Sequence, residues 1–216
     1  MDDQLTFPTT EAVLVTHGYT GHRWMMMPLV HHLRQAHFEV VNWGYRSIWR
    51  DIESHATAFR EQLDRLCSAE GVDRVHIVAH SMGAIVARQA LLNDRPNQLG
   101  RIVMLGPPNR GSHVARIYAG LFGWMSKPLQ QISDGKSSFV NQLADDLAEH
   151  CEVGIIAAQT DFVVRHASTP LPNSRGRITL PGLHSSMLWR ERTAQETIYF
   201  LQHGHFSTQS AHDNDE

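Results

Sequence analysis

The stretch "VHIVAHSMGAIVAR", residues 75–88, decides the fold. An apolar run ends at Ala79, and an apolar segment with helical spacing begins after Gly83. This change of pattern predicts a buried strand that turns directly into a helix. Ser81 therefore stands at the carboxyl end of a predicted strand, which is where open α/β sheets bind their ligands.

Strand and helix patterns alternate along the rest of the chain. Short apolar runs predict strands, and apolar positions at helical spacing predict helices. The strands are expected at 12–18, 38–45, 75–79, 101–105, 153–159 and 177–180, and the helices at 24–36, 51–71, 81–92 and 186–201. Because the central strands are apolar throughout, helices are expected on both faces of a mostly parallel sheet, and the fold class is α/β.

Length and composition set the limits of this organisation. The 216 residues suit one α/β domain, expected at 1–206, followed by a flexible polar tail at 207–216. The net charge of −3 gives no sign of nucleic-acid binding. With no signal-peptide pattern and no apolar run of about 20 residues, we expect a cytoplasmic protein without a membrane span. The sequence does not indicate an oligomeric state.

Neither the cysteines nor the histidines indicate a cofactor or a metal. Cys67 and Cys151 are far apart in the sequence, and we expect two reduced thiols. Fifteen histidines invite a metal-binding interpretation, but no HExxH motif or Cys/His cluster with ligand spacing occurs. We therefore expect no metal and no cofactor.

The residues around Ser81 are those that an exposed nucleophile needs. A side chain at this turn points outward only if the backbone turns sharply, and bulky residues two positions away would then clash. Ala79 and Gly83 occupy those positions, with His80 and Met82 between them and the serine. This arrangement is the nucleophile elbow, usually written G-x-S-x-G, and the following helix directs its N-terminus toward developing negative charge. The alternative is a serine that only caps the helix.

A serine hydroxyl needs a base, and the base needs an orienting carboxylate. His184, in "RITLPGLHSSML", follows the last predicted strand and is the expected base. Asp161 follows the strand in "VGIIAAQTDFVV" and is the expected acid, although an aspartate there can also cap a turn. The competing carboxylates are Asp134, in "SDGK", and Asp145 and Asp146, which we expect to be exposed helix residues.

Together these stretches resemble the α/β-hydrolase superfamily, and within it small bacterial esterase- and lipase-like proteins. The resemblance covers residues 11–206 and rests on "VTHGYTGHRWMMMPL", "VVNWGYRS", "VHIVAHSMGAIVAR", "VMLGPPNRGS" and "LPGLHSSML". It implies a triad of Ser81, Asp161 and His184. The chain departs from the usual pattern in two places, because Ala79 replaces the first glycine of the elbow and Phe162 follows the acid where relatives often have glycine.

The resemblance also implies an oxyanion hole and a cap. The backbone N–H groups of Met82 and Tyr19 would hold the oxyanion, since His17-Gly18 matches the H-G start of the corresponding loop in lipases. The residues expected to form the elbow and the substrate pocket are His17, Gly18, His80, Ala79 and Gly83. Residues 111–143 would form a small helical cap insertion. Its apolar residues either meet an acyl chain or pack on the sheet; they are Ile117, Tyr118, Leu121, Phe122 and Trp124.

We therefore expect a serine hydrolase, esterase- or lipase-like, that cleaves carboxylic esters through an acyl-enzyme. Its partner would be a small-molecule ester with an apolar acyl group. A thioesterase, an amidase or an acyltransferase could use the same triad, because a fold does not select among these reactions. A noncatalytic binding protein on this scaffold is the alternative from another class, and the retention of both Ser81 and His184 argues against it.

Overall fold

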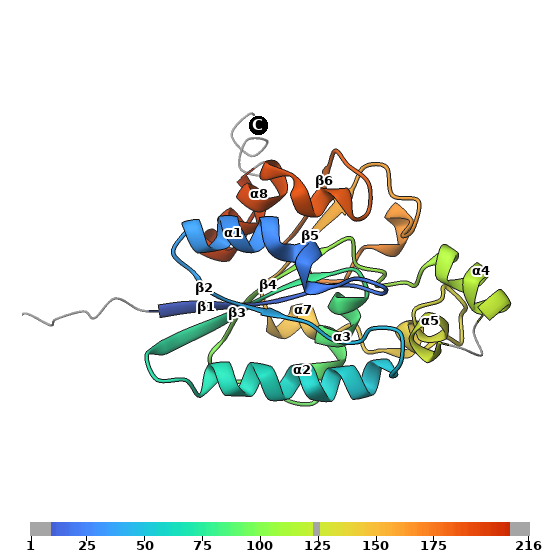
Figure 1. The fold of residues 1–216 in the computed structure, drawn as a ribbon, viewed down its shortest axis with the longest axis horizontal. Coiled ribbons are helices and arrows are strands. Elements are labelled where there is room, and N and C mark those ends of the chain that lie inside the picture. Colours follow the sequence, from blue (N-terminus) through green and yellow to red (C-terminus); the bar gives the residue numbers. More distant parts are fainter. Residues whose placement is uncertain (1–9, 123–125, 208–216) are drawn as a thin grey trace, which may run out of the picture.

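A single parallel sheet carries the fold (Figure 1). The computed structural model describes residues 10–122 and 126–207, and for residues 120–122 it describes the backbone alone. The strands are β1 (Thr10–Thr16), β2 (Glu39–Trp43), β3 (Val72–His80), β4 (Leu99–Leu105), β5 (Val153–Ala158) and β6 (Gly176–Leu180). They lie in the order β2-β1-β3-β4-β5-β6, and every neighbouring pair is parallel. All carboxyl ends therefore meet at one edge of the sheet, and this edge is called the carboxyl edge below.

Helices cover both faces of the sheet, as Figure 1 shows. The helices are α1 (Met27–Gln35), α2 (Ile52–Cys67), α3 (Met82–Ala90), α4 (His113–Phe122), α5 (Lys127–Gln131), α6 (Phe139–Gln142), α7 (Leu147–His150) and α8 (Glu191–His203). Side chains alternate along β1, so that Val13 and Val15 pack in one core with α1 and α8, while Leu14 packs in the other with α2 and α3. The strands are apolar throughout because both of their faces are buried.

Most expected elements are present, with short differences at their ends. Helix α2 begins after Asp51, whose side chain accepts a hydrogen bond from the Ser54 amide at 3.0 Å. Helix α1 is preceded by the 3₁₀ turn η1 (Arg23–Met26), and Pro28 lies in its first turn, where the missing N–H has no cost. The helix expected at 186–201 is divided into η4 (Ser186–Trp189) and α8, because Arg190 has an extended backbone.

Asp145 corrects one expectation. It was expected on an exposed helix, but it lies in a bend before α7 and accepts a hydrogen bond from Arg88 at 2.9 Å. The Arg88 side chain, on α3, is 1% exposed and also donates to the Asn109 side chain. A buried guanidinium needs such partners, because an uncompensated buried charge costs several kcal/mol. This cluster fixes α3, the helix that follows Ser81, to the segments after β4 and before β5.

Two terminal features also bear on the expected organisation. Ser207, expected to start the flexible tail, donates its hydroxyl to the buried Glu196 carboxylate at 2.6 Å. The remainder of that tail, 208–216, lies outside the described residues, as does Trp124.

Cys67 and Cys151 are both free thiols. None of the helices in residues 10–122 and 126–207 has both the length and the apolar character needed to cross a bilayer.

Candidate active site

Ser81 occupies a strained turn between β3 and α3. Its backbone has φ +54° and ψ −125°, a left-handed conformation that costs a side-chain-bearing residue about 1–3 kcal/mol. Its amide donates to the Leu105 carbonyl at 2.8 Å, which anchors the turn to β4. The Ser81 side chain makes no capping hydrogen bond to α3, so the helix-cap interpretation is not supported.

Small residues let the turn pack against the loop after β1. A Cβ atom at Gly83 would lie 2.6 Å from the His17 carbonyl oxygen and 2.9 Å from the Thr16 side chain. A Cβ atom at Gly18 would lie 2.7 Å from the Ser81 Cβ. These distances explain why the elbow has glycine at its last position, and why the loop that faces it also has glycine.

Gly83→Ala is expected to lower the free energy of unfolding by about 1–3 kcal/mol, because the new methyl group meets backbone that cannot move aside. Urea unfolding at neutral pH measures the loss. Gly135→Ala is the matched control, since its Cβ would meet only the Ser133 hydroxyl at 3.7 Å, an ordinary contact. Equal stability of the two variants would show that the elbow is not tightly packed.

The structure brings Ser81, His184 and Asp161 together from three separate connections of the carboxyl edge. His184 Nε2 lies 2.8 Å from Ser81 Oγ, and His184 Nδ1 lies 2.7 Å from Asp161 Oδ2. With Nδ1 protonated, the imidazole donates to the carboxylate and leaves the Nε2 lone pair to accept the serine proton. The Asp161 side chain is 2% exposed, so the three groups form one buried chain of hydrogen bonds.

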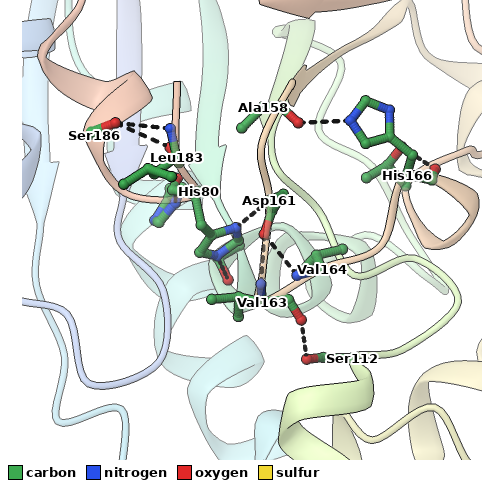
Figure 2. Close-up of polar contacts among 12 residues, drawn as sticks. His80, Ser112, Ala158, Asp161, Val163, Val164, His166, Leu183 and Ser186 are labelled. Carbon is green, nitrogen blue, oxygen red and sulfur yellow. Dashed lines mark hydrogen bonds and ion pairs between the residues drawn. The ribbon is translucent and has the colours of Figure 1, made fainter. Parts of the chain in front are cut away.

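Asp161 is held by its own loop (Figure 2). Its Oδ1 accepts hydrogen bonds from the amides of Val163 and Val164, both at 2.8 Å. Burial alone would raise the pKa of this carboxyl, but hydrogen bonds and charge from His184 and the two amides outweigh it, so the pKa is lowered. Phe162, the residue after Asp161, projects into solvent and is 77% exposed. Its side chain therefore leaves the carboxylate's contacts intact.

The loop after β1 is fixed by His17. His17 Nδ1 donates to the Gly18 carbonyl at 2.9 Å, and its Nε2 accepts from the Tyr45 amide at 3.3 Å. The Tyr45 ring stacks on the imidazole, with centroids 4.6 Å apart, and its hydroxyl donates to the His17 carbonyl. Burial lowers the pKa of His17, which keeps the ring neutral for these roles. Tyr19 follows in the same loop and donates its hydroxyl to Ser126 at 2.9 Å.

His80 contacts the loop that carries His184. It is buried, and its Nε2 donates to the His184 carbonyl at 3.1 Å, while the two rings lie 4.9 Å apart. Burial, followed by repulsion from His184, lowers the pKa of His80 to about 3. The imidazole is therefore neutral and serves as a hydrogen-bond donor to the loop that carries His184.

The free energy of unfolding is expected to fall as the pH drops from 7 to 5. In the folded protein, burial lowers the pKa of His80 to about 3 and that of His76 to about 4, so both stay neutral. In the unfolded chain they take up protons below about pH 6.5, and each excess proton removes about 1.4 kcal/mol per pH unit. Urea unfolding at several pH values measures this slope. His80→Leu should reduce the slope by about one proton, and an unchanged slope would contradict the assignment.

A cavity of about 490 Å³ opens beside Ser81. Its walls come from the loop after β1, the elbow, α4 and α5, and the loops of Asp161 and His184. The residues that line it include Gly18, Tyr19, Met25, His80, Ser81, Ala115, Tyr118, Leu129, Ile132, Val163, Val164 and His184. The lining is mostly apolar, which suits a ligand with an apolar portion at the serine.

The expected pocket residues divide into two groups. Gly18, Tyr19 and His80 line the cavity. His17, Ala79, Gly83 and the side chain of Met82 lie behind it, in the support of the elbow, and the Met82 side chain is fully buried in the core. Of the expected cap residues, Tyr118 lines the cavity and Ile117 is exposed, while the side chains of Leu121 and Phe122 are not described.

Two contributors were not anticipated from the sequence. Gly106, after β4, has φ +54°, and a Cβ there would lie 3.1 Å from the His184 ring. Ser112, before α4, donates its hydroxyl to the Val163 carbonyl at 2.6 Å and so ties α4 to the loop of Asp161 (Figure 2). The "LGPP" turn was a signal for Gly106, whereas nothing in the sequence pairs Ser112 with Val163. Within the described part of the chain, no group of three or more His, Cys, Asp or Glu side chains is arranged to hold a metal ion.

Comparison with known families agrees with this architecture. A family model described as alpha/beta hydrolase fold matches residues 11–155, more than half of the chain. The chain belongs to the α/β-hydrolase fold family. A curated relative, N-formylmaleamate deformylase of Pseudomonas putida, is 26% identical to this chain over 144 residues. The match covers 67% of this chain and 49% of the relative. The chain thus spans about half the length of that relative.

Solved structures resemble this α/β-hydrolase in fold. The mature form of Bacillus licheniformis lipase BlEst2 has a TM-score of 0.76 at 15% identity, with 93% of this chain and 94% of that chain covered. Aspergillus fumigatus lipase B has a TM-score of 0.74 at 16% identity, with 93% of this chain and 54% of that chain covered. At such identities the likeness concerns the fold, and the chemistry must be argued from the residues.

Proposed function

We propose that this α/β-hydrolase is a serine hydrolase that cleaves carboxylic esters through an acyl-enzyme intermediate. One observation carries the proposal: Ser81 Oγ, the His184 ring and the Asp161 carboxylate form a continuous chain of hydrogen bonds at the floor of an apolar cavity. A noncatalytic binding protein would have no need for a strained serine aligned with a buried imidazole and carboxylate.

The first half-reaction follows from the positions of these groups. His184 Nε2 accepts the Ser81 proton as Oγ attacks the ester carbonyl carbon, and the C–O bond to the alcohol then breaks while the imidazolium returns the proton to the leaving alcohol. Asp161 keeps its negative charge throughout and stabilises the imidazolium. In the second half-reaction, water takes the place of the alcohol, and its attack on the acyl-enzyme releases the acid and restores Ser81.

Main-chain N–H groups would stabilise the oxyanion. Met82 is the first residue of α3, where N–H groups lack acceptors within the helix, and Tyr19 follows the glycine that packs directly on Ser81. We assign the two donors to Met82 and Tyr19 on this basis. Removal of one such donor typically costs about 3–4 kcal/mol of transition-state stabilisation. The hydrogen bonds of His17 would hold the Tyr19 loop in place.

The substrate class follows from the cavity wall. The segment 111–143, which we propose acts as a cap, contributes Ala115, Tyr118, Leu129 and Ile132 to that wall. These side chains would receive an acyl chain. Each CH₂ group buried there is worth about 0.8 kcal/mol, or about a fourfold gain in kcat/KM, until the cavity is filled.

Amide hydrolysis is the second candidate, because the curated relative is named as a deformylase of an N-formyl amide. The same proton transfers would serve an amide, with His184 protonating the departing nitrogen. The mostly apolar lining of the cavity favours the ester with an apolar acyl group over a small charged amide.

A series of p-nitrophenyl esters, from acetate to palmitate, tests the proposal, with N-formyl amides as a parallel arm. We expect ester hydrolysis that rises with acyl length and then levels off or falls when the chain exceeds the cavity. Activity that favours the N-formyl amides would replace ester hydrolysis by amide hydrolysis. No hydrolysis of any ester or amide, from a folded protein, would overturn the proposal.

A further inference from the structure

The exposed large apolar side chains of the described chain all lie at the carboxyl edge. They lie in the connections that follow the carboxyl ends of β1, β2, β4, β5 and β6. None of those described lies in a connection at the opposite edge of the sheet. They are Trp24, Met27, Ile48, Trp49, Ile117, Tyr118, Phe162, Val163, Leu183 and Trp189. Scattered exposed apolar residues need no explanation, but a set confined to one edge of a protein marks an interaction surface.

Part of this exposed set adjoins the mouth of the cavity. Tyr118 and Val163 belong both to its lining and to the exposed set. Trp189 donates its indole N–H to the Met25 carbonyl at 3.2 Å, so the loop after β6 lies beside η1, which carries Trp24. The exposed set thus includes side chains beside η1, at the cavity and on α4, the helix labelled in Figure 1.

Three tryptophans give this surface a particular chemistry. Trp24 is 70% exposed, Trp49 is 75% exposed and Trp189 is 62% exposed. Exposed indoles are costly in bulk water, and they are favoured at the boundary between water and lipid, where the ring is buried and the N–H stays wet. They come from three different connections, so no single groove holds them.

The charge at this edge is uneven. Five arginines there form no ion pair with a described carboxylate: Arg23, Arg46, Arg50, Arg165 and Arg190. Most of the described carboxylates at this edge pair with a cation, as Asp51 does with Lys127 and Asp134 with Arg116. Glu53 and Glu191 have neutral partners instead. The opposite edge has the reverse balance, with unpaired Glu39, Glu70 and Asp73 against Arg34. The whole protein carries a net charge of −3, yet the edge around the mouth of the cavity carries an excess of positive charge.

Two of these arginines stand at a second hollow of about 520 Å³, which Arg46, Arg50 and Trp49 line together with Tyr45 and His55. His55 is 4% exposed, and its Nε2 atom has no hydrogen-bond partner in the described chain. The hollow thus offers two guanidinium groups and an indole beside an unsatisfied buried nitrogen. This combination suits the phosphate and the polar part of a lipid headgroup.

We propose that the carboxyl edge binds an anionic lipid surface, with the mouth of the cavity turned toward the lipid. The apolar side chains would enter the headgroup region, and the arginines would meet lipid phosphates. A lipid surface needs no fixed shape, and this fits apolar residues presented by five separate connections better than a folded protein partner does. The inference rests on exposure and charge, so it stands apart from the chemistry proposed at Ser81.

Vesicle flotation with the full Ser81→Ala chain tests the proposal without lipid turnover. The vesicles are phosphatidylcholine alone, or phosphatidylcholine with about 30% phosphatidylglycerol. We expect binding to the anionic vesicles, weakening with added salt, and little binding to the neutral ones. No binding to either kind of vesicle at low salt would overturn the proposal, whatever the result with soluble esters.

Two double variants locate the surface. Arg46→Gln with Arg50→Gln should lower the partition coefficient by about 30-fold, since each arginine near an anionic membrane contributes about fivefold. The matched control is Arg65→Gln with Arg175→Gln, which removes the same charge from exposed, weakly paired arginines away from this edge. Equal losses in the two variants would contradict the location and indicate a general effect of net charge.

Trp49→Ser with Phe162→Ser should lower the partition coefficient by about tenfold or more, because two side chains no longer enter the lipid. The same pair distinguishes the lipid surface from a second copy of this chain. If sedimentation shows a dimer that these substitutions dissociate, and vesicles are not bound, the edge is a protein interface and the proposal is wrong.

Discussion

Ser81→Ala is expected to lower kcat for ester hydrolysis by about 10⁶-fold, with little change in stability. In the proposed mechanism the variant loses the atom that attacks the carbonyl, and His184 then has no hydroxyl to deprotonate. The fold should survive, because the Ser81 side chain bonds only to the His184 ring and makes no cap of α3. Initial rates on the preferred p-nitrophenyl ester, together with thermal unfolding, measure both expectations.

The control for this variant is Ser137→Ala, an exposed serine in the segment between α5 and α6. Its activity should equal that of the wild type. A Ser81→Ala protein that keeps more than about 1% of wild-type kcat would place the nucleophile elsewhere, since a missing triad serine leaves only binding and oxyanion stabilisation.

Asp161→Asn is expected to lower kcat by about 10⁴-fold through the wrong histidine tautomer. Oδ1 of Asp161 accepts two backbone amides, so an asparagine must keep its oxygen there. Its NH₂ group then faces His184 Nδ1, which becomes an acceptor, and the ring proton moves to Nε2. That nitrogen can no longer accept the Ser81 proton. The isosteric change therefore blocks the base while it leaves the loop in place.

The pH profile distinguishes this explanation from loss of structure. The remaining activity of Asp161→Asn should rise steeply at high pH, where hydroxide can replace the missing base, while thermal unfolding stays near that of the wild type. Asp134→Asn is the control. Asp134 lies between α5 and α6, pairs with Arg116 on α4, and is the competing candidate for the acid. Normal activity in Asp161→Asn and loss in Asp134→Asn would reverse the assignment.

Local sequence patterns are sufficient to predict most of the fold. The apolar runs of β1, β3, β4 and β5 are buried on both faces, so their composition predicts a parallel sheet. Asp51 and Pro28 mark the starts of helices, because capping and the fixed backbone of proline act within one helical turn. Ser81, Asp161 and His184 could be selected because each follows a strand, and parallel strands bring their carboxyl ends together. The hydrogen bonds that join them are tertiary facts, which spacing alone does not contain.

The misjudged residues depend on contacts between distant segments. Asp145 looked like a surface helix residue because its partner, Arg88, is 57 positions away. The break at Arg190 has no proline or glycine to announce it, and Trp189 just before it bonds to Met25 across 164 positions. His80 reads as one residue of a motif, and its hydrogen bond to the His184 carbonyl shows only in three dimensions.

The most direct test of the central claim is labelling with a fluorophosphonate probe, followed by peptide mapping. One adduct is expected, on Ser81, formed rapidly by the folded protein, absent in Ser81→Ala and strongly slowed in His184→Ala. A folded wild-type protein that forms no adduct, or forms it on another residue, would contradict the claim that Ser81 is a nucleophile activated by His184.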